Sequence, residues 1–171
     1  MNECIDEMRD LELKLLIIEY NKASQLDRSF SKTQLSQTKK IEFRERLLEY
    51  CLFLMKKIDD ETLKNSDIRG KIRELTKIDE NISFGQAQKV INVTLKSYCF
   101  IANKENLLKE LDCPLDTTTM RGNRIIHNKM IAVNEDDYLK YQNIYYKEFA
   151  GLRILKDCEY DKMRIHNFLN S

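Results

Sequence analysis

The sequence contains very little of the two residues that shape tight turns, with four glycines and one proline in 171 residues. A sheet of many strands reverses direction often, and Gly and Pro supply the backbone conformations for many of those reversals. Good helix formers such as Lys, Glu and Leu are plentiful. Because 42% of the residues are hydrophobic and 33% are charged, the chain has material for a packed core. The composition therefore favours an all-α fold.

Long hydrophobic runs are also missing. The longest run near the N-terminus is LLII at 15–18, far below the roughly 20 apolar residues that cross a bilayer. The first 20 residues carry acidic side chains and no small-residue cleavage site, unlike a secretory signal. We therefore expect a cytoplasmic protein that does not bind membranes.

Several motifs that carry chemistry are absent. The chain has neither a G-x-G-x-x-G nor a Walker lysine motif, so nucleotide-driven chemistry is not expected. It has five cysteines without a C-x-x-C pair and only two histidines, His127 and His166, which form no zinc motif. Reduced thiols, no cofactor and no metal site are expected, although the 28 scattered acidic residues leave a carboxylate-held magnesium open.

Charge of one sign is not in excess, since 29 basic and 28 acidic residues give a net charge of +1. A dedicated nucleic-acid coat protein has a strongly basic field over its whole surface. Any site for a polyanion such as RNA must therefore be local.

Apolar residues recur at spacings of three and four along most of the chain, the pattern of amphipathic helices. The spacing predicts one domain over 1–171, a bundle of about six helices with a short irregular or hairpin insertion near 115–133. The main expected helices cover 3–22, a stretch from near Ser31 to Ile58, a weaker stretch to Ile78, a central helix from Ser83, a helix from Asn134, and a last helix with Leu155, Cys158, Met163 and Phe168 inward.

Helix starts are marked by capping residues. Ser83 with Gln86 fits the S-x-x-Q capping box, in which each side chain satisfies a free backbone N–H of the other residue. Asn134 with Asp137 marks a second start, and the Asp59–Asp60 pair is expected to cap the weaker helix.

Two patterns on the expected helices admit a functional and a structural interpretation. Gln88, Lys89 and Asn92 form a polar patch on the central helix that recognises a ligand or simply meets water, because such residues are usually exposed. The aromatic stripe that follows Asn134 either stacks nucleic-acid bases or forms a core face. Its members are Tyr138, Tyr141, Tyr145 and Phe149.

The segment RGNRIIHNK places Arg121 six positions before His127. Histidine titrates near neutral pH and can take a proton from a ribose 2′-hydroxyl, while arginine can hold a phosphate and its developing charge. The alternative is a histidine at a turn whose ring bonds a backbone carbonyl. This spacing resembles the R-x4-6-H motif of the HEPN family of helical ribonucleases and toxins.

That resemblance implies metal-independent cleavage of RNA by Arg121 and His127, at a composite site formed by a homodimer. Family members usually place a polar residue directly after the arginine, whereas here Gly122 stands in that place and Asn123 follows. Asn123 is therefore the expected supporting residue, and Arg124 competes for the phosphate contact.

A second resemblance lies in FGQAQKVIN followed by DCPLD, which is similar to a set of small uncharacterised bacterial and phage-borne proteins. It implies a structural unit and no known activity. Two functions stay open at this point. One is a HEPN-like endoribonuclease, and the other is a non-enzymatic interaction or inhibitor protein, from a mobile element or a defence system, that binds a protein or another macromolecule.

Overall fold

A computed structural model describes residues 2–23, 30, 34–121 and 129–170 of the chain. Those residues form six α-helices and two short 3-10 helices, and they contain no strand, so the predicted all-α class is confirmed. The elements are α1 (Asn2–Ala23), α3 (Gln37–Asp59), α4 (Asn65–Thr76), α5 (Phe84–Ile101), η1 (Glu105–Glu110), η2 (Met130–Ala132), α6 (Glu135–Glu148) and α7 (Leu155–Leu169).

Two predicted helix caps are confirmed. At the start of α5 the Ser83 hydroxyl accepts the Gln86 backbone N–H at 3.1 Å, and the Gln86 side chain accepts the Ser83 N–H at 2.9 Å. At the start of α6 the Asn134 side chain accepts the Asp137 N–H at 2.9 Å. Both caps satisfy donors that the first helical turn leaves unpaired.

Two other helix starts differ from the prediction. Helix α3 begins after Ser36, whose side chain accepts the Lys39 N–H, and not near Ser31. The Asp59–Asp60 cap is wrong, because Asp59 is the last residue of α3 and α4 begins only after Lys64.

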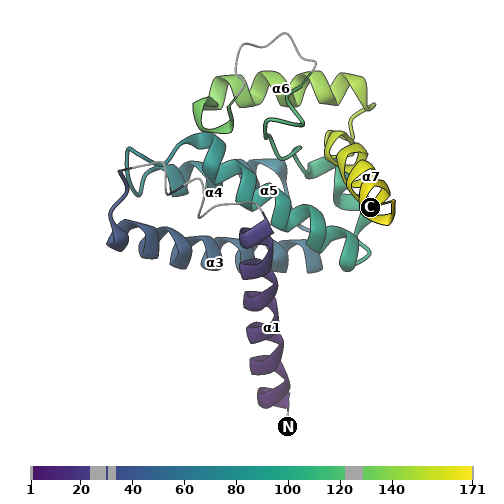
Figure 1. The fold of residues 1–171 in the computed structure, drawn as a ribbon. Coiled ribbons are helices and arrows are strands. Elements are labelled where there is room, and N and C mark those ends of the chain that lie inside the picture. The colour runs from purple at the N-terminus through teal and green to yellow at the C-terminus, as the bar shows by residue number, and fades with distance from the viewer. Residues whose placement is uncertain (1, 24–29, 31–33, 122–128, 171) are drawn as a thin grey trace.

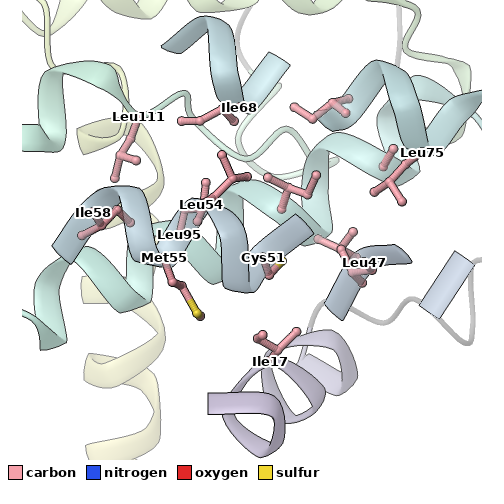
Figure 2. Packing of buried hydrophobic residues seen from close by; sticks show 14 of the residues in the cluster. Ile17, Leu47, Cys51, Leu54, Met55, Ile58, Ile68, Leu75, Leu95 and Leu111 are labelled. Atoms are coloured by element: carbon pink, nitrogen blue, oxygen red, sulfur yellow. The ribbon is translucent and has the colours of Figure 1, made fainter. Parts of the chain in front are cut away.

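Helix α5 lies at the centre of the larger hydrophobic cluster. It packs against α1, α3 and α4, and Figure 2 shows Leu95 of α5 among side chains of the surrounding helices. The neighbours labelled there include Leu54 and Ile58 of α3 and Ile68 of α4, all fully buried. The buried residues of α3 are Phe43, Leu47, Cys51, Leu54, Met55 and Ile58.

Helix α6 covers a second, smaller cluster. In Figure 1 it lies above α4 and α5, on the side away from α3. Tyr138, Tyr141 and Tyr145 are fully buried and pack with Cys113, Leu115, Met120 and Val133. Of the two interpretations of the aromatic stripe, the core face is confirmed for these three tyrosines, which have no exposed ring for a base.

Helix α7 is less buried than predicted. Leu155 and Cys158, near its start, are half-buried, but Met163 and Phe168 are exposed. The expectation that Met163 and Phe168 point inward is wrong, since α7 is held by ion pairs from Asp157 and Asp161 to α5 and its later turns extend beyond that contact.

Of the insertion predicted near 115–133, the structure describes a turn at 117–121 and η2, which are irregular and contain no strand. Among the helices described, none combines the length and the apolarity needed to traverse a lipid bilayer.

Candidate functional site

Arg121 is the one member of the predicted catalytic set that the structure describes. It ends the turn at 117–121, where its side chain is exposed and its backbone N–H donates to the Thr118 carbonyl at 3.1 Å. Asn123, Arg124 and His127 lie outside the described residues. The pairing of Arg121 with His127 therefore stays a prediction.

The turn that carries Arg121 is firmly anchored. The Asp116 carboxylate accepts the backbone N–H groups of Thr118 and Thr119 at 2.8 and 2.9 Å. The Thr119 hydroxyl donates to the Pro114 carbonyl at 3.0 Å, and the Tyr145 hydroxyl donates to the Thr119 carbonyl at 2.6 Å. These four hydrogen bonds hold the turn that ends at Arg121.

Gln88, predicted to lie in a polar surface patch, is fully buried. Its Nε2 donates to the carbonyls of Gly85 and Leu115 at 3.0 and 2.7 Å. Its Oε1 accepts the Leu115 backbone N–H at 3.0 Å and Nδ2 of Asn92 at 3.2 Å. The whole hydrogen-bonding capacity of the amide is used, and two of its four bonds join the segment around Leu115 to α5.

Asn92 is buried as well, and its Nδ2 donates to the Tyr138 hydroxyl at 2.9 Å. Lys89 is half-buried, with Nζ 3.4 Å from Asp116 in an ion pair. The prediction that Gln88 and Asn92 lie in an exposed patch is wrong, because α6 and the chain around Leu115 cover this side of α5. A contact of Lys89 with a ligand stays a prediction.

Gln142 of α6 holds the same segment from the opposite side, which the sequence prediction missed. Its Oε1 accepts the Cys113 backbone N–H at 2.9 Å, and its Nε2 donates to the Cys113 carbonyl at 2.8 Å. Gln142 lies four residues after Tyr138 and three before Tyr145, on the stripe that packs inward. That position was the available signal of a buried amide.

Asp112 is a fully buried carboxylate at the centre of a charged cluster. Its Oδ2 accepts Nε of Arg69 and the Tyr138 hydroxyl, both at 2.8 Å. Nε of Arg153 lies 2.7 Å from Oδ1 in an ion pair. Burial first, and then the charge of Asp112, raise the pKa of Tyr138 well above its ordinary value, so its hydroxyl keeps the proton that it donates.

A second buried cation joins α5 to α7. Nζ of Lys96 contacts Asp157 and lies 2.5 Å from Oδ2 of Asp161. Burial alone would lower the pKa of Lys96, but the two carboxylates outweigh it and raise that pKa. The buried charged side chains of these two clusters thus form ion pairs that join segments of the fold. In that part of the chain no three His, Cys, Asp or Glu side chains gather in a way that could hold a metal ion.

Helix α1 has apolar side chains on two of its sides. Its side chains Leu13, Leu16 and Ile17 pack on the larger cluster, while a different stripe of the helix faces solvent. The stripe, which we call the α1 stripe, consists of Met8, Leu11, Leu15 and Ile18, with exposed fractions of 53, 48, 54 and 38%.

Figure 1 shows that the N-terminal half of α1 projects away from the other helices. Comparison of the chain with protein-family models, with curated proteins and with solved structures finds no match.

Proposed function

We propose that this protein is a non-enzymatic interaction protein that binds another protein chain through the α1 stripe. The observation that carries the proposal is that α1 has two apolar faces. One face packs against the core of the chain, and the second, the α1 stripe, is exposed. Singly scattered apolar residues are normal on protein surfaces, whereas a contiguous stripe marks an interaction site.

The projection of α1 adds a physical reason. Short helices of about 12 residues are only marginally stable in water, because few hydrogen bonds offset the cost of helix nucleation. The N-terminal half of α1 extends beyond the helices that support Leu13 and Ile17. A partner along the stripe would supply the packing that this half of the helix lacks.

Photo-crosslinking inside the native cell tests the proposal. A photoreactive amino acid replaces Leu15 in the stripe, and a control replaces Glu45, an exposed residue of α3. The expected result is a discrete covalent adduct from position 15 and none from position 45. Absence of any adduct from position 15, with the folded protein present, would refute the proposal.

A second function, a metal-independent endoribonuclease, is favoured by one observation. The resemblance to the HEPN motif requires an arginine that can reach a phosphate, and Arg121 is exposed on an anchored turn. An arginine in that position can stabilise the charge of a scissile phosphate while a histidine moves the proton.

The ribonuclease proposal is tested with labelled RNA in the presence of a chelator. Wild-type protein is compared with Arg121→Ala and His127→Ala, and Arg46→Ala, on the exposed face of α3, serves as the matched control. Cleavage by wild type and by Arg46→Ala, lost in the other two variants, is expected. Equal activity in all four proteins, or none in any, would contradict it.

A further inference from the structure

Helix α7 contacts the rest of the fold with little apolar packing. Among the side chains of α7 that the structure describes, Asp157 is the only buried one, and none of the apolar ones belongs to either hydrophobic cluster. No described side chain caps the N-terminal turn of the helix. Helices of about 12–15 residues are only marginally stable in water unless an apolar face packs on other elements. Other contacts must therefore hold α7 in place.

Lys96 of α5 forms two ion pairs with α7. Its side chain is buried, and Nζ contacts Asp157 and lies 2.5 Å from Oδ2 of Asp161, one helical turn later. A further ion pair joins Lys156 to Glu148 of α6 at 3.6 Å, but the Glu148 side chain is 45% exposed. Exposed ion pairs contribute little to stability. The buried pairs of Lys96 are thus the charged contacts on which the position of α7 depends.

The segment before α7 is fixed independently of Lys96. Nη2 of Arg153 donates to the Lys109 carbonyl at 2.9 Å, and Nε lies 2.7 Å from Oδ1 of Asp112. The next residue, Ile154, is fully buried in the larger cluster. A movement of α7 can therefore pivot directly after Ile154 without disturbing the core.

Closing α7 over Lys96 brings little net free energy, because the attraction within a buried ion pair must offset the lost hydration of both charges. Opening would return these charges to water and would expose little apolar surface of α7. Segments with few buried apolar contacts open well below the free energy of global unfolding. We infer that α7 is a conformational switch, which opens from α5 about Ile154 while the rest of the chain stays folded, and that the Lys96 ion pairs hold it closed.

The switch is independent of the α1 stripe. Opening uncovers the Lys96 ammonium group on α5 and the Asp157 carboxylate on α7, both buried in the closed form. A ligand that binds only the open form would shift the equilibrium toward it.

Removal of the Lys96 charge should affect the docking of α7 and not the fold of the other helices. In Lys96→Met the Asp157 carboxylate lacks its cation while α7 is closed, and an unpaired buried charge is strongly unfavourable. Opening of α7 relieves this cost, because the carboxylate regains water. The matched control is the same substitution at Lys162, an exposed lysine of α7.

Hydrogen exchange of the full-length chain, followed by mass spectrometry, tests the switch. In wild type the amides of 155–163 should be at least about 100-fold less protected than those of α5, since they exchange through local opening. Lys96→Met should lower the protection of 155–163 by a further factor of about ten or more and leave α3 and α5 unchanged. Lys162→Met should leave all of these segments unchanged.

A double variant tests the role of the ion pair itself. Lys96→Met combined with Asp157→Val replaces the two charges with apolar side chains, an exchange that is often neutral for stability in a buried site. Protection of 155–163 should therefore recover toward that of wild type. A double variant no better protected than Lys96→Met would overturn the assignment of the ion pair as the closing contact.

The remaining outcomes concern the opening. Equal loss of protection in α5 and α7 of Lys96→Met would mean that α7 unfolds only with the whole chain, and the inference would fail. It would fail equally if 155–163 were as protected as α5 in wild type, or if Lys96→Met exchanged like Lys162→Met.

Discussion

Replacing glycine with alanine should have opposite effects on the free energy of unfolding at two positions on neighbouring helices, Gly85 and Gly70. Gly85 lies in the first turn of α5, and a Cβ built there would stand 1.8 Å from the Met130 carbonyl oxygen and 2.8 Å from its carbon. The Gly85 N–H also donates to the Val133 carbonyl at 3.1 Å. Gly70, in the interior of α4, has no atom within 4 Å of the same position.

The size of the stability loss expected for Gly85→Ala depends on which atoms must move to make room for the new methyl group. The clashing atoms belong to the backbone of η2, so no side-chain rotation relieves the contact. Overpacking costs about 1–3 kcal/mol and the hydrogen bond to Val133 contributes about 1, so the free energy of unfolding should fall by about 2–4 kcal/mol. Gly70→Ala should raise it by about 0.5–1 kcal/mol, because alanine favours a helix interior.

Urea unfolding of the two full-length variants, followed by far-UV circular dichroism, measures both changes. The midpoint should move down for Gly85→Ala and up for Gly70→Ala, with similar slopes. A Gly85→Ala protein as stable as wild type would mean that α5 and η2 do not approach each other as described. A lower midpoint for Gly70→Ala would contradict the open surroundings of that glycine.

Three further predictions concern the interior. Asp112→Ala should lower the free energy of unfolding by about 3–5 kcal/mol, because it leaves Arg69 and Arg153 without their buried carboxylate, as urea unfolding would measure. Ser83→Ala should lower it by about 1 kcal/mol in the same assay, since the capping hydroxyl at the start of α5 is lost. Burial raises the pKa of Cys51 to about 12, so in the folded protein its alkylation, followed by mass spectrometry, should stay slow from about pH 7 to about pH 9. In urea the thiol regains its ordinary pKa, and its alkylation should accelerate as the pH rises through that range.

The controls are matched to each change. Glu49→Gln on the exposed face of α3 and Ser66→Ala, an exposed serine in the first turn of α4, should leave the urea midpoint unchanged. Asp112→Ala with no more effect than Glu49→Gln would contradict the account of the charged cluster. A Ser83→Ala midpoint equal to that of Ser66→Ala would contradict the role of the cap. Equally fast alkylation of Cys51 in folded and unfolded protein would contradict the burial of its thiol.

Much of the helical framework was predictable because its signals are local. Caps such as Ser83 and Asn134 act on backbone groups within three residues, so the sequence alone indicates them. The spacing of the tyrosines of α6 allowed a core face as one of two interpretations, and the structure confirms it. The start of α4 was not predicted, since α3 includes Asp59 and ends in a turn in which Glu61 is left-handed and the Thr62 N–H donates to the Lys57 carbonyl.

The candidate sites were less predictable. Amides are usually exposed, and nothing in the sequence near Gln88 and Asn92 indicates that α6 and the chain around Leu115 will cover them. The same applies to Phe168, an apolar residue at helical spacing whose side chain is nevertheless exposed. The Arg121 turn is described, whereas the geometry of His127 is still a prediction from the motif.

By itself the sequence determined the helical class and several helix starts, because these depend on composition and on spacing along one chain. Only the tertiary structure decided which apolar side chains of α1 would be buried. Ile17 is buried by α3 and α5 while Leu15, two residues earlier, is left to solvent, and the amides of α5 are closed in by a segment more than twenty residues away. Burial is set by contacts between distant segments, and a spacing pattern cannot specify which partner each face will meet.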